Sequence, residues 1–391
     1  MQNVSQPQPV VEQFLHLCLR GFWDPPSLEA AVALASQGRL DWAAFRRAAG
    51  EEGLSPLLYH VVGGREVVPA PVEKALREAY YRLGGHNTLL LHELKRILCA
   101  LAAEAVPVLL LKGAALIETA YGNPALRPMV DLDLLVPLAQ VGIAHSALAK
   151  SGYGMITSDP WPDFSWRYRN SVAYGRPSGR GLPWLVGLHA QAFDVPYYER
   201  IPVGDWFGRA QSAPGAGPGA RVPAPEDHLV YLCGHLALHH QYDLALLRLV
   251  DIALLIQRAG KALDWGQTLD RAVDWRLVIP VQHTLDRLER LWPGTIPSHV
   301  ALRLARLQPH GSERRVYHWV VGHPRTPASD TLLALGTLPG LARRARFLLE
   351  VAFPSPAYMR QRYRPRHPGF WPLTYWQRAG LALQYLLRRL R

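Results

Sequence analysis

The sequence predicts an α+β fold, in which a small mixed β-sheet with helices is flanked by N- and C-terminal helical regions. Segments toward both ends of the chain carry apolar residues at spacings of three and four, the period of a helix. Between them, short apolar runs alternate with loops rich in glycine and proline, which indicates strands joined by turns. We therefore expect four regions, at 1–105, 106–221, 222–340 and 341–391.

Helical periodicity dominates the first 105 residues and returns after residue 222. The first region carries it in FLHLCLRGFW, LEAAVALASQG, WAAFRRAAGEEG and the long LREAYYRLGGHNTLLLHELKRILCALAAEA. The later region carries it in EDHLVYLCGHLALHHQ, LALLRLVDIALLIQRAG and VDWRLVIPVQHTLDRLERLW. The Pro/Gly-rich stretch SAPGAGPGARVPAPED lies just before the later helices, so it marks a boundary between regions.

The middle region begins with a short apolar run, Val106 to Leu111, which we expect to be a strand. Lys112-Gly113 then turn the chain into the helix-like segment AALIETAY. Further strands are expected at VDLDLLV and WLVGLHA.

Two aspartates, Asp131 and Asp133, interrupt the apolar segment VDLDLLV. Buried carboxylates are costly unless they are paired, hydrogen-bonded or bound to a cation. Alternate residues of a strand share a face, so the two carboxylates would lie together, roughly 6.5 Å apart along the backbone. The pair therefore predicts a Mg²⁺ site. The alternative is that it marks the solvent face of an edge strand.

The Lys112-Gly113 turn can receive a phosphate. Glycine lets the backbone approach an anion closely, and the first N–H groups of a helix are unsatisfied donors at the positive end of its dipole. A polyphosphate on this turn would reach a cation held by the two aspartates. The alternatives are a surface lysine at a strand end and a glycine that only starts a helix.

These motifs together resemble the nucleotidyltransferase superfamily, and most closely the bacterial family of uncharacterised nucleotidyltransferases. Weaker likenesses to that family extend over most of the chain, at Pro225 to Leu229, at His235-x-x-x-His239, at Arg248 to Asp251 and at Phe353 to Tyr358. The strongest motifs are Leu111-Lys112-Gly113, then Tyr121-Gly122-Asn123-Pro124 with Arg127, and then Asp131 to Val136.

The resemblance implies transfer of a nucleotide from an NTP to an acceptor, with Mg²⁺ held by Asp131 and Asp133. Lys112 or Arg127 would clamp the β- and γ-phosphates, and Gly113 would give the backbone room. Arg127 could instead pair structurally with an aspartate. The acceptor would be a small molecule, peptide or glycan, bound between the strand region and the helices that follow residue 225.

One position departs from the family pattern. The resemblance implies a third carboxylate two residues before the histidine of a strand that ends in Leu-His, and here Gly187 stands at that place before Leu188-His189. Substitutes could come from His189, Asp194 or Asp163. If none serves, the chain would be a catalytically degenerate relative that binds a nucleotide or a partner.

Three histidines, His235, His239 and His240, lie close together in the sequence. Residues at i and i+4 of a helix share a face, but Leu236 stands where HExxH motifs have glutamate, and no third ligand is evident. We expect His235 and His239 to line the seam between the helical region and the sheet, with contact to the acceptor as the alternative. Arg248 and Asp251 predict an ion pair on a helix surface.

Composition points to a cytoplasmic protein. The chain has three widely spaced cysteines, an N-terminus without a signal-peptide pattern, and apolar runs that charges interrupt before 18 residues. Its net charge of +12 is concentrated after residue 341, where arginines alternate with aromatic residues. That mixture suits nucleic acid or an anionic membrane surface, and a third function class is therefore a basic binding module. Compositional bias toward arginine is the alternative.

Overall fold

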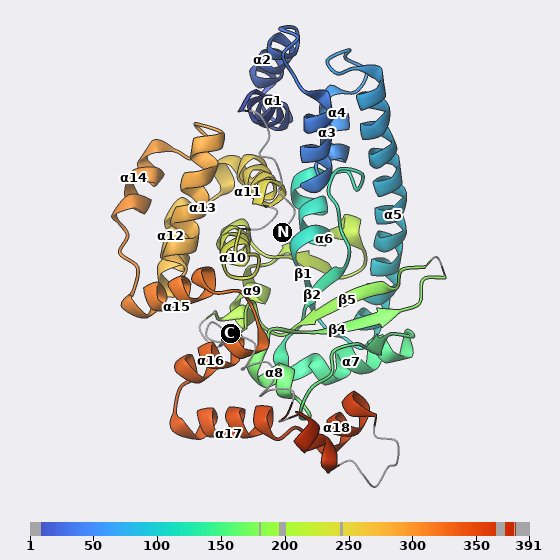
Figure 1. Cartoon of the computed structure of the whole chain (residues 1–391), viewed down its shortest axis with the longest axis vertical. Coiled ribbons are helices and arrows are strands. Elements are labelled where there is room, and N and C mark those ends of the chain that lie inside the picture. The colour runs from blue at the N-terminus through green and yellow to red at the C-terminus, as the bar shows by residue number, and fades with distance from the viewer. Residues whose placement is uncertain are drawn as a thin grey trace.

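The computed structural model describes residues 9–179, 181–194, 201–242, 245–364, 372–378 and 380. These residues form helices around one seven-stranded mixed sheet of order β3-β4-β5-β2-β1-β7-β6 (Figure 1). The predicted α+β class is confirmed. The strands are β1 (Val108–Leu110), β2 (Leu132–Leu135), β3 (Gly154–Met155), β4 (Ser171–Arg176), β5 (Trp184–His189), β6 (Gln211–Ser212) and β7 (Ala220–Val222).

The part of the predicted N-terminal helical region that the structure describes, from residue 9 onward, contains five helices. The last of them, α5, is long enough to run from the other four helices down to the sheet, as Figure 1 shows. Its first half packs against α4, and its second half contributes apolar side chains to the core beneath the sheet. The bounds are α1 (Pro9–Arg20), α2 (Pro25–Ala35), α3 (Trp42–Glu51), α4 (Ser55–Val62) and α5 (Ala70–Ala103).

The helices that follow the sheet share a hydrophobic core with the N-terminal ones. Buried side chains of α1, α3 and α4 belong to the same cluster as those of α10, α11 and α13. Trp292 fixes the contact, since its indole N–H donates to the carbonyl oxygen of His16 over 3.0 Å. These helices are α10 (Pro225–Leu238), α11 (Ala245–Ala259), α12 (Trp265–Asp274), α13 (Val278–Leu291), α14 (Ser298–Arg306) and α15 (Gly311–Gly322), with the short η4 (Gly260–Ala262).

The two faces of the sheet meet different helices, because successive side chains of a strand point to opposite sides. Leu132 and Leu134 of β2 pack into the core formed with α5 and α7, whereas Leu135 joins the core that contains α10. Asp133 has the same parity as Leu135, so it faces the α10 side. The connecting elements are α6 (Lys112–Leu116), η1 (Ile117–Tyr121, a π-helix), η2 (Leu138–Gln140), α7 (Val141–Lys150), α8 (Phe164–Tyr168), α9 (Val203–Arg209) and η3 (Pro214–Ala216).

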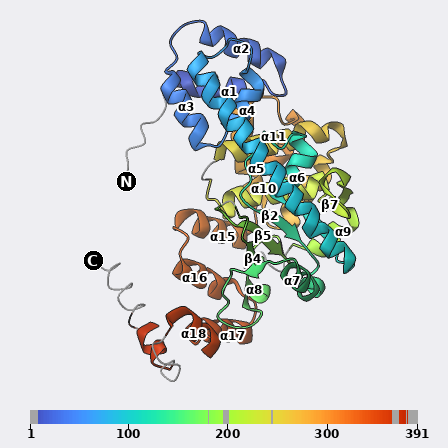
Figure 2. The ribbon, with the colours of Figure 1, turned by 90° about the vertical axis from the view of Figure 1, so that its right-hand side faces the viewer.

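The C-terminal helices α16 (Pro327–Thr337), α17 (Leu341–Ala352) and α18 (Pro356–Tyr363) lie beyond the sheet, at the end of the molecule opposite α1 and α2 (Figures 1 and 2). Phe347 of α17 packs with Phe164 and Tyr168 of α8, and the Ser355 N–H donates to the carbonyl oxygen of Pro160 over 2.7 Å. Part of the predicted basic tail is therefore docked on the strand region. The arginine- and aromatic-rich residues 365–371 and 381–391 lie outside the described residues.

All three cysteines are free thiols, as expected, although Cys99 is exposed. Among the helices that the structure describes, none combines the length and the apolarity needed to span a bilayer.

Candidate active site

Asp133 lies in β2 and contacts two of the other predicted site residues. Its Oδ1 accepts from Lys112 Nζ at 3.0 Å and from His189 Nε2 at 2.8 Å. Burial acts to raise the pKa of this carboxyl group, but the charge of Lys112 and the hydrogen bond from His189 outweigh it and lower the pKa. Asp133 is therefore an ionised carboxylate with a side chain only 7% exposed.

Lys112 reaches Asp133 from the turn that follows β1. It is the first residue of α6, and its φ of 47° lies in the left-handed region that residues other than glycine seldom adopt. Burial opposes its charge, yet the neighbouring Asp133 and Asp131 raise the pKa of the amine above its ordinary value. The strained turn thus holds a charged amine against the aspartate pair.

Asp131 lies one residue before β2, partly exposed beside Asp133. Burial, followed by the negative charge of Asp133, raises its pKa. Among the described residues none donates a hydrogen bond to Asp131 or to Oδ2 of Asp133. These uncompensated carboxylate oxygens are the hard donors that Mg²⁺ prefers. The two residues therefore fit a magnesium ion.

His189 takes the place where a third acid was expected. In the parallel pairing of β2 with β5, Asp133 lies opposite Gly187. A Cβ atom on Gly187 would come within 2.8 Å of Asp133 Oδ1 and 3.1 Å of His189 Nε2, so the imidazole already fills that space. Asp194, by contrast, accepts from the Asn170 N–H and pairs with Arg325, and Asp163 is exposed at the start of α8.

Arg127 is engaged in a buried ion pair. Its Nε and Nη2 donate to both carboxylate oxygens of Asp251 on α11, and the Tyr121 hydroxyl donates to Asp251 Oδ1 over 2.8 Å. The prediction placed the pair of Arg248 and Asp251 on a helix surface. That placement is wrong, because the Asp251 side chain is only 2% exposed. Sequence spacing along α11 could not reveal a partner 124 residues away.

Side chains of neighbouring residues occupy the space where a side chain at Gly113 would lie. A Cβ atom there would meet Arg127 Nη1 at 2.5 Å and the Met129 side chain at 2.7 Å. The glycine thus lets the side chains of the Asp-bearing loop pack against α6, and this close approach accounts for the absence of any larger residue.

Helix α10 covers the aspartate pair from the helical side. Tyr231 is completely buried, and no described group pairs with its hydroxyl. Burial raises its pKa, and the charges of Lys112, Asp133 and Asp131 also act on it, which places it beside them. Sequence analysis missed Tyr231. The available signal was its position one helical turn before His235, since residues at i and i+4 share a face.

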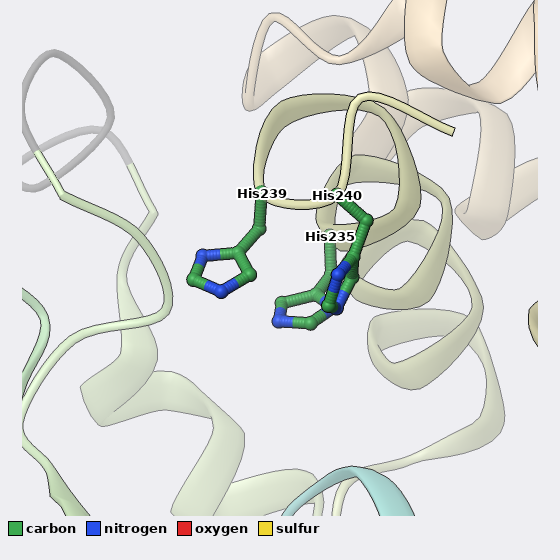
Figure 3. Close-up of side chains that lie close together, drawn as sticks. All are labelled: His235, His239 and His240. Carbon is green, nitrogen blue, oxygen red and sulfur yellow. The ribbon is translucent and has the colours of Figure 1, made fainter. Parts of the chain in front are cut away.

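His235 and His239 line a small cavity between the sheet region and the helical region, together with Asp194 and Arg325. The sequence made no third ligand evident beside His235 and His239, but the imidazole of His240 packs against His235, as Figure 3 shows. A larger cavity of about 570 Å³ adjoins the first, because both share Asp194, Arg325, Asp330 and Leu333. Its remaining walls come from the segment 158–169, from α16, α17 and α18, and from Arg378, with Phe347, Tyr358 and Arg362 among them.

Residues 38–293 match the sequence model of a family described as an uncharacterised nucleotidyltransferase. The matched segment covers more than half of the chain. It contains Asp131 and Asp133 together with their neighbours Lys112 and His189. No curated protein matches the chain.

Proposed function

The chain belongs to the family of uncharacterised nucleotidyltransferases, and we propose that it transfers a nucleoside monophosphate from an NTP to a hydroxyl or amine of an acceptor. The observation that carries this proposal is the pair Asp131 and Asp133, of which Asp131 directly precedes β2 and Asp133 lies within it, with the Lys112 amine on Asp133. Two carboxylates and one cation on a single sheet face form a site for a metal-bound triphosphate.

Asp131 and Asp133 would hold Mg²⁺ through the oxygens that have no described hydrogen-bond donor. When bound there, the ion would neutralise charge on the α-phosphoryl group and the leaving pyrophosphate. The raised pKa of Asp131 supports this assignment, because a carboxylate destabilised by a second negative charge gains the most from a nearby cation.

Lys112 would bind a phosphate oxygen of the triphosphate through its amine. Its side chain is 20% exposed and starts from a strained turn, so its amine can rotate from Asp133 toward a phosphate oxygen without leaving the site. An ammonium ion in this position stabilises negative charge that develops as the phosphorus–oxygen bond breaks. Arg127 and Gly113 would act by fixing that turn, since Arg127 is held by Asp251 and packs on Gly113.

His189 would position Asp133. Its side chain is only 2% exposed and its Nε2 donates to Asp133 Oδ1, which leaves Oδ2 directed away for the metal. An imidazole stands in place of the third carboxylate, so the site carries less negative charge than the usual family pattern. We expect weaker metal affinity as a consequence.

The acceptor would enter through the larger cavity and approach the metal site past His239 and Asp194. The cavity walls offer aromatic rings from Phe164, Tyr168 and Phe347 beside the guanidinium groups of Arg169 and Arg362. Stacking and charge together favour an acceptor that carries a flat or apolar group and a negative charge.

Calorimetry of Mg²⁺-dependent NTP binding tests the site. The double substitution Asp131→Asn with Asp133→Asn should abolish binding, whereas Asp286→Asn, which removes one carboxylate of a surface pair on α13, should leave it unchanged. Binding that persists in the double variant would contradict the assignment of both aspartates.

A second candidate is a relative that binds Mg-NTP without turnover. It is favoured by Gly187 and by the imidazole that fills the space of the third acid. Pyrophosphate release in the presence of small-molecule, peptide and glycan acceptors separates the two functions. NTP binding with no release for any acceptor class would support the non-catalytic one.

A further inference from the structure

The end of α10 brings three imidazoles together on one side of the helix. The helix ends at Leu238, and the N–H groups of both His239 and His240 then donate to the carbonyl oxygen of His235. The chain therefore folds back instead of advancing, and the His240 ring returns toward His235. Figure 3 shows the three side chains converging on the same space.

The spacing of the rings suits a common ligand. The ring centroid of His235 lies 4.7 Å from that of His239 and 4.6 Å from that of His240. One nitrogen from each of the three rings lies within 4.8 Å of the other two. Imidazole nitrogens that share a tetrahedral zinc ion lie about 3.3 Å apart, given zinc–nitrogen bonds of about 2.0 Å. Small side-chain rotations would close the difference.

The chemistry of the cluster differs from that of the aspartate pair. Burial lowers the pKa of all three imidazoles, to about 4 for His239 and about 3 for His240, and nearby cations such as Lys112 and Arg248 act in the same direction. The rings are therefore neutral. Arg325 Nη1 lies 3.4 Å from His239 Nδ1, a long contact that a metal ion bound at this nitrogen would replace. Neutral imidazole selects zinc, copper, nickel or cobalt and is a poor ligand for Mg²⁺.

The charges around the cluster do not exclude a cation. Lys112 is paired with Asp133, and Arg325 is paired with Asp194 and Asp330. The carboxylates of Asp194 and Asp133 act on His239 in the opposite sense to those two cations. A metal ion would thus enter a field in which much of the nearby positive charge is compensated.

We propose that His235, His239 and His240 form a transition-metal site of the zinc class, distinct from the magnesium site of the aspartates. Because His235 and His239 also line the cavity, three protein ligands would leave a coordination position open toward it. Sites with three histidines and an open position are the kind that bind a water or a substrate atom. The proposal does not depend on nucleotidyl transfer.

Metal titration of the full chain, stripped by chelation, provides the test. Calorimetry with Zn²⁺ in excess Mg²⁺ should show one zinc ion per chain, and Co²⁺ should give the visible absorption of a tetrahedral complex. His239→Ala or His240→Ala should weaken zinc binding at least about a hundredfold, because each removes a direct ligand. His323→Ala is the matched control, since His323 lines the same cavity outside the cluster.

Two results would overturn the proposal. One is a wild-type chain that binds neither Zn²⁺ nor Co²⁺ stoichiometrically. The other is zinc binding that survives in the His239→Ala variant but is lost in Asp131→Asn with Asp133→Asn, which would assign the ion to the carboxylates. His239 is exposed, so its substitution leaves the fold intact, and the Co²⁺ spectrum of the wild type tests the site without any variant.

Discussion

At the scale of single residues, the pairing of Arg127 with Asp251 is the contact that anchors the Asp-bearing loop to the helical region. Asp251→Asn should destabilise the protein by about 3 kcal/mol, because it leaves the buried guanidinium without a counter-charge. Urea unfolding measures the loss.

The matched control is Asp286→Asn. Asp286 pairs with Arg290 on α13, and both side chains are more than 60% exposed, at 64% and 70%. Its removal should change stability by less than about 0.5 kcal/mol. Equal losses in the two variants would show that burial adds nothing to the Arg127–Asp251 pair.

The sequence predicts those site residues whose signal is local. Asp131, Asp133 and Lys112 were found from strand parity and a turn, and the structure brings them together. His189 was one of three alternatives, and the structure places it on Asp133. Tyr231 was missed, because its relevance depends on how α10 packs over the sheet. His240 was named but not recognised as a third ligand, because its position depends on how the chain folds back at the end of α10.

At the scale of elements, α10 is a helix with little polar surface, since nearly every residue from Glu226 to Leu238 is buried. Such a helix must bury whatever ionisable groups it carries. Burial, aided by the charge of Arg127, lowers the pKa of His228 to about 3. Its imidazole is therefore neutral in the folded protein at pH values where it is protonated in the unfolded chain.

Acid should consequently destabilise the protein through His228. Its contribution is complete above the unfolded pKa of about 6.5 and decreases as the pH falls toward 3, because only the unfolded chain takes up the proton in that interval. Between pH 7 and pH 5 the wild type should lose about 2 kcal/mol more than a His228→Gln variant.

Urea unfolding at the two pH values measures this difference. His92→Gln provides the control, because His92 is exposed on α5, and it should show the same pH dependence as the wild type. An unchanged loss in the His228→Gln variant would contradict the burial effect.

Sequence periodicity predicts the long or apolar elements and misses the short ones. The strands β1, β2 and β5 fall within the expected segments, and the helix α5 covers most of its expected segment but begins earlier, at Ala70. The two-residue strand β6 and the three-residue strand β7 lie at the start of the Pro/Gly-rich connection and within it. They are too short for an alternation of apolar and polar residues to predict them. They form because β7 pairs in parallel with β1, a contact between residues more than a hundred positions apart.

At the scale of the whole molecule, helices from both ends of the chain enclose the sheet. The shared core of the flanking regions holds α10 over the aspartate pair, and α17 and α18 close the larger cavity. This arrangement would place the proposed NTP site and the proposed acceptor site in different parts of the molecule. The described side-chain hydrogen bonds and ion pairs of Asp133 and Lys112 join α6, β2 and β5, whereas the cavity walls come partly from beyond residue 340.

A chain that ends at residue 340 should therefore bind Mg-NTP with an affinity within about twofold of the full chain, because distant sites with no shared partners behave independently. It should lose transfer to the acceptor, since Phe347, Tyr358 and Arg362 of the cavity wall are removed. A chain that ends at residue 378 keeps α17, α18 and the wall residue Arg378 and is the control, so transfer should survive in it. NTP calorimetry and pyrophosphate release measure the two properties. Loss of NTP binding in the shorter chain would mean that the C-terminal helices support the metal site itself, and the separation of the two sites would be wrong.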